Sequence, residues 1–581
     1  MISRGAAVAI ACGLAMVAGM PPLSAEDNAE ARFRGAGKAD PIRIGNVRQA
    51  GGPVAGRSSV VFDLGWDHSW RADWKESADR HGGTGTLSLE NWDAAWVFIK
   101  FRKPGDDSYS HATLSSSRAD HHVPSGAALD VGLTDDRRRG VGVFVYRDAA
   151  GHGAKVWHGV SLCWLHGADG VDNADSVDIE VLAIEMVYVP KGPFWAGDGA
   201  TKKVAAQFSA GKASDPFHIQ SEGAITLGGE SNMNLGNRDG IGLYWVEDFN
   251  GGRTRTLPPQ FPKGYAAFYC MKHEITQGQY VAFLNTVSFD QQARLTGVGV
   301  NTAAGSLIAG GQRNRIKLAV PGKPPAAQEA SRRGSVVWSV SNGKPATPAV
   351  YETDTPHVAC NWLKASDGAA FAAWAGLRPM TELEYEKACR GPLKPVPGEF
   401  AWGTAAIAGT NSREGPRDGY AIHNAGRADE SVTWMGENGP DATRGNAAWG
   451  GTVSQQNGSY AVNGINGPLR VGIFAAPDSD RVRAGASYWG IMELTGNLWE
   501  FAVSVGHHAG RRFAGTDGEG TAIPPTDWHY RGDFAFGRRG GSAGAWKHSG
   551  NIEGISGRWK MDAPSRGFSA NNGFRCVRTA P

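Results

Sequence analysis

The chain has 581 residues, which is too long for one ordinary hydrophobic core, so we expect at least two domains. Its 59 Lys and Arg nearly balance its 57 Asp and Glu, and without a dense basic run this composition argues against a nucleic-acid partner. The 81 Gly and 20 Trp indicate a loop-rich, aromatic-packed globular protein rather than a disordered one.

The N-terminus has the pattern of a secretory signal peptide. Arg4 precedes an apolar run from Ala6 to Met20, and small residues lead to a candidate cleavage site after Ala25. A membrane anchor is the alternative, but this run is shorter than the roughly 20 residues that span a bilayer. We therefore expect residues 1–25 to be a signal peptide, and the mature protein to be secreted or periplasmic and not membrane-spanning.

Strand patterns follow a polar, Gly-rich stretch, residues 26–56, that we expect to be a linker. Alternating apolar segments separated by Gly, Asp and Ser turns predict strands at Val60–Trp66, Ala95–Arg102, Val141–Arg147, Val160–Leu165 and Val177–Val189. Short strands of this kind favour an antiparallel β-sandwich over residues 57–182. The four Trp residues of this region could form a sugar-stacking platform, but core packing is the favoured interpretation for Trp66, Trp70, Trp92 and Trp96.

Two helices are predicted further along. Thr276 and Gln279 have the spacing of a capping box, and apolar residues follow on one face at Tyr280, Phe283, Leu284 and Val287. Thr381 and Glu384 repeat the capping box before a second helix. Just upstream of it, Asp367 is a candidate cap of a further helical segment that Gly376 would end.

Five cysteines remain after cleavage, an odd number, so at least one thiol is unpaired in a monomer. No Cys-x-x-Cys motif supports a zinc or thioredoxin-like site. Cys163 lies in a segment that reads as a core strand, so we expect it to be free and buried.

Six phrases, in one order, resemble the formylglycine-generating enzyme, or sulfatase-modifying factor, family. They are EMVYVPKGPFWAGD (Glu185–Asp198), HEITQGQYVAFLN (His273–Asn285), WAGLRPMTELEYEKACRG (Trp374–Gly391), YWGIMELTGNLWEF (Tyr488–Phe501), RRGGSA (Arg538–Ala543) and NGFRCVR (Asn572–Arg578). The resemblance covers residues 183–581. It implies a loop-rich domain with the C-type-lectin-like fold and bound calcium, so the whole chain is expected to be α+β, with the sandwich preceding this domain.

The resemblance also identifies what is missing. In the family, two cysteines after the Gly-Gly-Ser phrase bind copper and use oxygen to convert a substrate cysteine to formylglycine. The matching positions here are Ala545 and Gly550, which offer neither a metal ligand nor a nucleophile. We therefore expect no catalytic residues of that kind, no copper and no formylglycine-generating activity. The family's partner for the cysteine of the GFRC phrase is Ala372 here, so Cys576 is free or pairs elsewhere, with Cys360 the nearest alternative.

Calcium ligands, by contrast, are retained in the resemblance. The family's second calcium loop matches Glu493, Gly496, Leu498 and Glu500, which supply two carboxylates and two backbone carbonyls. Alternatively, Glu500 only accepts bonds from backbone amides in a turn. A first calcium site would begin at Asn446 and Ala447, with Asn463 and Asn466 as guesses for later ligands.

Two functions remain open from the sequence. One is an exported, calcium-stabilised binding or structural module whose extracytoplasmic ligand, a protein or a glycan, is unknown, with a cleft near Trp499 and Trp546. The other is an enzyme on the same scaffold with a different, cysteine-independent reaction, including a metal-dependent oxidation. We favour the first, because a His-rich set of metal ligands is not visible in the sequence.

Overall fold

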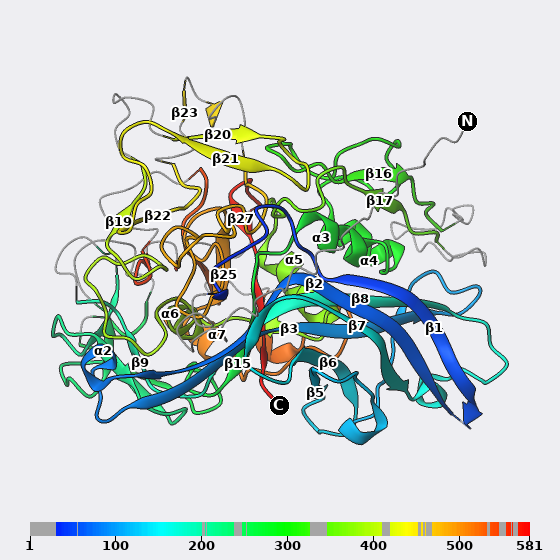
Figure 1. Ribbon diagram of the computed structural model, residues 1–581, viewed down its shortest axis with the longest axis horizontal. Helices are drawn as coiled ribbons and strands as arrows, with labels where there is room; N and C mark the ends of the chain where they lie inside the picture. Colours follow the sequence, from blue (N-terminus) through cyan, green and yellow to red (C-terminus); the bar gives the residue numbers. More distant parts are fainter. Residues whose placement is uncertain are drawn as a thin grey trace, which may run out of the picture.

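A computed structural model describes residues 31–581, with gaps at 55, 200–203, 205, 238–246, 251, 326–345, 410–418, 451–454, 457–458, 461–466, 531–534, 545–553, 559–560 and 562–567. Strands predominate over helices in these residues, consistent with the α+β class (Figure 1). The expected signal peptide, residues 1–25, lies outside the described residues. None of the described helices is long and apolar enough to cross a membrane.

The predicted N-terminal strands are confirmed. They belong to an eleven-stranded sheet in the described residues, whose N-terminal members are β1 (Arg43–Val54), β2 (Arg57–Glu76), β3 (Leu87–Arg102), β4 (Ser110–His111), β5 (Ala127–Leu133), β6 (Gly140–Arg147), β7 (Gly151–Trp164) and β8 (Asp178–Val189). Apolar side chains of β2, β3, β5, β6, β7 and β8 form one hydrophobic core. Core packing of the four tryptophans is also confirmed, because Trp66, Trp70, Trp92 and Trp96 are all buried.

The sheet continues directly into the second half of the chain. β8 pairs with β3 on one side and with β15 (Phe268–Met271) on the other, and β28 (Cys576–Thr579) and β18 (Arg378–Pro379) complete the order. The expected boundary at residues 182–183 therefore falls inside a strand shared by both parts. Independent folding of the two parts stays a prediction.

The prediction that residues 26–56 form a linker is wrong for much of this segment. Residues 43–54 of it form β1, which pairs antiparallel with β2 from Arg43↔Gly65 to Val54↔Arg57. Upstream of β1, Ala31 and Phe33 are buried. The stretch lacks the apolar alternation typical of strands, but backbone pairing along β2 requires no particular side chains, so composition alone did not reveal it.

Both predicted helices are confirmed with their capping boxes. α3 (Gln277–Leu284) begins after Thr276, and α6 (Glu382–Arg390) begins after Thr381. The expected cap Asp367 is wrong: α5 (Ala365–Trp374) begins after Lys364, and Asp367 occupies its third position, where it accepts a bond from the Lys364 backbone N–H. We did not predict α4 (Phe289–Leu295), although Ser288 and Gln291 form a capping box at its start.

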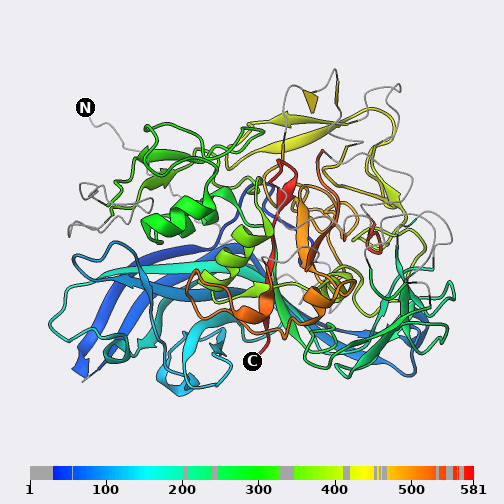
Figure 2. The same cartoon turned by 180° about the vertical axis from the view of Figure 1, so that it is seen from behind.

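The helices and the loop-rich part lie against the sheet. In Figures 1 and 2, α3, α4 and the β16–β17 pair (Lys317–Val320 and Val350–Glu352) lie above the long N-terminal strands, and β5 and β6 lie below them. β28 runs through the middle of the molecule in both views. The C-terminal strand thus ties the module to the sheet.

The remaining elements are short, as the turn-rich sequence predicts. The other helices are α2 (Ala78–His81) and α7 (His508–Arg511), with 3-10 turns at Arg118–Asp120, His166–Asp169 and Thr526–Trp528. The other strands are β9 (Phe194–Ala196), β10 (Phe208–Ala210), β11 (Phe217–Ile219), β12 (Ile225–Gly228), β13 (Leu235–Asn237), β14 (Thr254–Leu257), β19 (Ala406–Ile407), β20 (Gly419–His423), β21 (Ser431–Met435), β22 (Arg444–Gly445), β23 (Gln455–Gln456), β24 (Ser459–Tyr460), β25 (Trp499–Val503), β26 (Phe536–Arg539) and β27 (Asn572–Gly573).

Candidate functional site

The predicted calcium loop is a tight, irregular turn that leads into β25. Glu493, Gly496 and Asn497 all have positive φ, at 55°, 87° and 59°. An alanine at Gly496 would bring its Cβ to 2.6 Å from the Ala448 carbonyl oxygen, so glycine is required there by space as well as by φ. Backbone carbonyls in such a turn point in several directions, which suits the irregular coordination of calcium.

Glu500 is buried at the start of β25, and only one of its two carboxylate oxygens is hydrogen-bonded. The Arg575 side chain donates from Nε and Nη2 to Glu500 Oε1, at 2.9 Å and 2.7 Å. Glu500 Oε2 is buried and has no hydrogen-bond partner. Burial raises the pKa of Glu500, against the lowering effect of Arg575. A buried carboxylate oxygen without a partner is costly, and a cation would relieve that cost.

A second carboxylate, which sequence reasoning missed, supports the same turn. Glu274 Oε1 accepts from the Leu498 backbone N–H at 2.8 Å, and its Oε2 accepts from the Asn497 side chain. Burial raises the pKa of Glu274 far above its usual range, and the charges of Glu500 and Glu493 raise it further. The only signal in the sequence was an acidic residue just before a capped helix, in the HEIT phrase.

Glu493 has partners other than this pair. Its Oε1 accepts from the Gly472 backbone N–H at 2.6 Å, and its Oε2 lies 3.2 Å from His273 Nδ1. Among the described residues, no group of three His, Cys, Asp or Glu side chains is arranged to hold a metal ion. A cation at this loop would therefore use backbone carbonyls beside Glu500, as the residues Gly496 and Leu498 were predicted to provide.

At the first calcium site predicted from the sequence, the side-chain oxygen and nitrogen of Asn446 already have protein partners. Asn446 Oδ1 accepts from the Tyr420 hydroxyl, and its Nδ2 donates to the Arg483 carbonyl. Ala447 is buried in a small aromatic cluster with Trp402 and Trp449. The guessed later ligands, Asn463 and Asn466, lie outside the described residues.

Several of the phrases that resemble the family contribute side chains to a buried ionic network beside the loop. In β26, Arg539 contacts Glu382 at 3.1 Å and Glu386 at 2.8 Å, both on α6. Arg558 contacts the same Glu382 at 2.7 Å. These side chains are almost fully buried, so they fasten the segment before the Gly-Gly-Ser phrase to a helix and have no exposed atoms for chemistry.

A protein-family comparison identifies this arrangement. The family model described as "Sulfatase-modifying factor enzyme 1-like domain" matches residues 180–580. The chain belongs to the sulfatase-modifying factor family. A search of curated proteins finds no match.

In this sulfatase-modifying factor family member, the positions that match the family's copper-binding cysteines, Ala545 and Gly550, lie outside the described residues, as does Trp546. The preceding Ser542 is buried, and its Oγ has no hydrogen-bond partner. Trp499, the other residue of the expected cleft, is 5% exposed, so its ring offers little surface to a ligand, and the cleft stays a prediction.

The five cysteines of this family member that the structure describes are all free. Cys270, Cys360, Cys389 and Cys576 are buried, and burial raises the pKa of each thiol; for Cys270 it reaches about 12. Cys163 is free as predicted but only half-buried, because it lies on the opposite face of β7 from the buried Leu162 and Trp164. Protonated, buried thiols are poor metal ligands and poor nucleophiles.

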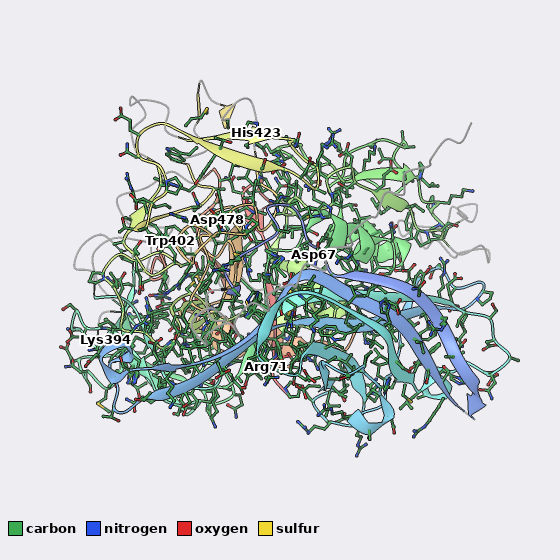
Figure 3. The ribbon with its side chains drawn as sticks, viewed as in Figure 1. Asp67, Arg71, Lys394, Trp402, His423 and Asp478 are labelled. Carbon is green, nitrogen blue, oxygen red and sulfur yellow. The ribbon has the colours of Figure 1, made fainter. Side chains whose placement is uncertain are left out.

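A separate cavity lies where the N-terminal part meets the family module. Its walls come from the segment 35–42, from β8 and β15, and from α3. Asp40 Oδ2 lies 2.6 Å from His68 Nδ1, and His68 Nε2 lies 2.8 Å from Lys272 Nζ. Figure 3 labels Asp67, the neighbour of His68 on β2, at the centre of the molecule where that strand passes beneath the module. The sequence did not predict this cluster, because Asp40, His68 and Lys272 are far apart in the chain and share no motif.

Proposed function

We propose that this protein is an exported member of the sulfatase-modifying factor family that binds calcium at residues 493–500 and does not generate formylglycine. Its module then serves as a calcium-stabilised scaffold for binding an extracytoplasmic protein or glycan, next to a predicted β-sandwich. The observation that carries the proposal is the buried, half-partnered carboxylate of Glu500.

The loss of the family reaction rests on side-chain chemistry. Copper(I) requires soft ligands, and exchange with a substrate thiol requires a thiolate. Neither Ala545 nor Gly550 can supply these groups. Burial raises the pKa of the four buried cysteine thiols and so disfavours their thiolate forms, which supports the same conclusion.

Calcium binding is supported by the fit of the residues to the ion. Glu500 would contribute its unpartnered oxygen, and Gly496 and Leu498 would contribute backbone carbonyls. Glu274, Glu493 and Glu500 bring three carboxyl groups close together, and Arg575 forms an ion pair with Glu500. A bound calcium ion would add positive charge among these three groups. Such an ion would stabilise the fold rather than act on a substrate.

Two measurements test the proposal. The first incubates the purified protein with a sulfatase-type cysteine peptide, copper and oxygen, and follows conversion by mass spectrometry; clear turnover would overturn the first part. The second measures the melting temperature with calcium and with a chelator. A rise with calcium is expected, and equal temperatures would overturn the second part.

The alternative is an enzyme with another reaction on this scaffold. Its support is the cavity beside His68, Lys272 and His273, which gathers ionisable groups of the kind used in acid–base chemistry. Metal analysis of the pure protein separates the two functions. Calcium alone favours the scaffold, and stoichiometric iron or copper favours a metal-dependent oxidation.

A further inference from the structure

The cavity between the N-terminal part and the module has a volume of about 280 Å³. This is close to the lower end of the range of pockets that bind small molecules. Its walls come from residues 35–42, which we call the N-terminal strap, and from β2, β8, β15, α3 and residues 470–475. A ligand there would contact both parts of the chain at once.

The strap closes one side of the cavity through backbone contacts. Gly35 and Gly37 donate to the carbonyls of Ala476 and Ala475, at 3.2 Å and 3.3 Å. A Cβ on Gly35 would lie 2.6 Å from the Ala475 Cβ, so the strap approaches the module as closely as a glycine allows. Asp40 accepts from the backbone N–H groups of Asp67 and His68, which fixes the other end of the strap on β2.

The acidic groups that line the cavity already have cationic partners. Asp40 lies 3.1 Å from the Arg43 guanidinium and also contacts His68, whose pKa is lowered by burial and by the charge of Lys272. Glu185 Oε1 accepts from Lys272 Nζ at 2.7 Å. Neither carboxylate therefore needs a cation from a ligand.

Arg470 is a buried charged group of the lining that has no ion pair among the described residues, whereas Lys38, which also has none, is exposed. Arg470 is 1% exposed, and its Nε and Nη1 donate only to backbone carbonyls, those of Glu430 at 2.8 Å and Val471 at 3.0 Å. Its Nη2 is buried without a hydrogen-bond partner, and no carboxylate of the described residues forms an ion pair with it. The charges of Glu430 and Glu493 act favourably on Arg470, but neither carboxylate accepts from Nη2, which keeps a buried N–H group that a bound anion could satisfy.

The rest of the lining is largely apolar. Met271 and Met492 lie on one part of the wall, and Ala282, Val471 and Ala475 on others. Methionine side chains adapt their shape to an apolar ligand at low cost. The lining thus combines a buried guanidinium that has an unsatisfied N–H group with flexible apolar surface.

We propose that this cavity binds a small organic carboxylate, with the carboxylate on Arg470 and the apolar body along Met271 and Met492. Planar guanidinium groups recognise carboxylates through paired hydrogen bonds, and Arg470 has a donor available for this purpose. The site goes beyond the proposed function and stands whether or not residues 493–500 bind calcium.

The test uses the full mature chain in calcium-containing buffer and three probe pairs: butanoate with butanamide, hexanoate with hexanamide, and benzoate with benzamide. Binding is measured by calorimetry and by the shift in melting temperature. At least one carboxylate is expected to bind at least tenfold more tightly than its amide, which has nearly the same shape without the charge. No carboxylate binding up to about 10 mM, or equal binding of acid and amide in every pair, overturns the proposal.

Two variants locate the binding. Ala282→Leu adds bulk to the cavity wall on α3 while keeping a good helix former, and it is expected to abolish binding of the carboxylate. Ala150→Leu makes the same change at an exposed residue far from the cavity and is expected to bind like the wild type. A folded Ala282→Leu protein with wild-type affinity would show that the carboxylate binds elsewhere. The requirement for a carboxylate is tested separately, by comparing each acid with its amide on the wild-type protein.

Discussion

Asp40 and His68 join the strap to the sheet: Asp40 Oδ2 lies 2.6 Å from His68 Nδ1, although 27 residues separate the two. The same carboxylate accepts from the backbone N–H of Asp67 through both oxygens, at 2.9 Å each. One side chain therefore holds the strap, the start of β1 and the bend of β2 together.

Asp40→Asn is expected to lower the free energy of unfolding by about 2 kcal/mol, because a neutral amide replaces an acceptor of several charge-assisted hydrogen bonds. Urea denaturation measures the change. Asp106→Asn, at an exposed residue, is the matched control and should leave stability unchanged. An Asp40→Asn protein as stable as this control would show that the carboxylate does not hold the strap.

The pH dependence of stability should carry the signature of Asp40. Burial alone would raise its pKa, but the hydrogen bond and charge of His68, the Asp67 backbone N–H and the charge of Lys272 together outweigh burial and lower it from 3.8 to about 2. A carboxyl with a lowered pKa in the folded state stabilises the fold above the unfolded value and loses that effect as the pH falls. The wild type should lose this contribution between about pH 4 and pH 2, and Asp40→Asn should show a shallower slope there.

Calcium should stabilise the wild type but not Glu500→Gln. At a hundredfold excess over Kd, an ion bound only to the native state adds about 2.7 kcal/mol. Glu500→Gln weakens both the ion pair with Arg575 and the proposed site, so its baseline stability also falls. The decisive quantity is therefore the difference in melting temperature between calcium and chelator, measured beside the exposed control Glu230→Gln. A full calcium response in Glu500→Gln would place the ion elsewhere.

The thiols should react in a fixed order. Cys163 is half-buried, and the other four described cysteines are fully buried with raised pKa values. An alkylating reagent at pH 8 should therefore modify Cys163 first in the native protein, slowly, and the other four only after unfolding. Peptide mapping by mass spectrometry reads out the order, and a disulfide in the unreduced protein would contradict the free thiols.

Arg539→Lys should lower the free energy of unfolding by about 2–4 kcal/mol, because lysine cannot contact Glu382 and Glu386 from two nitrogens at once. Chemical denaturation measures the effect. Arg138→Lys makes the same exchange on the surface, where the side chain is 85% exposed, and should be neutral. Equal stabilities would mean that the network beside the Gly-Gly-Ser phrase does not support the fold.

The sequence predicted local features well, because local features depend on nearby residues. The capping boxes at Thr276 and Thr381 and the alternation in β3 were confirmed for this reason. β1 was not predicted because its pairing is made by the backbone. α4 was missed although Ser288 and Gln291 have the same capping-box spacing as Thr276 and Gln279.

The candidate sites show the same limit. Glu500 could be found because its phrase resembles a family motif, whereas Glu274 acts on the loop from 224 residues away. Asp40, His68, Lys272 and Arg470 come together only through the fold, and no spacing in the sequence connects them. The sequence alone also does not show whether Arg470 has an ionic partner, because that depends on which side chains the fold places beside it.

The shared strand β8 has a practical consequence for recombinant work. A fragment starting at residue 183 would lose the first five residues of β8 and, with β3 gone, leave the backbone edge of the rest unpaired. Exposed strand edges of this kind promote intermolecular pairing and precipitation. Expression of the module should therefore keep β3 and all of β8, and an insoluble short fragment would say nothing about the folding of the intact chain.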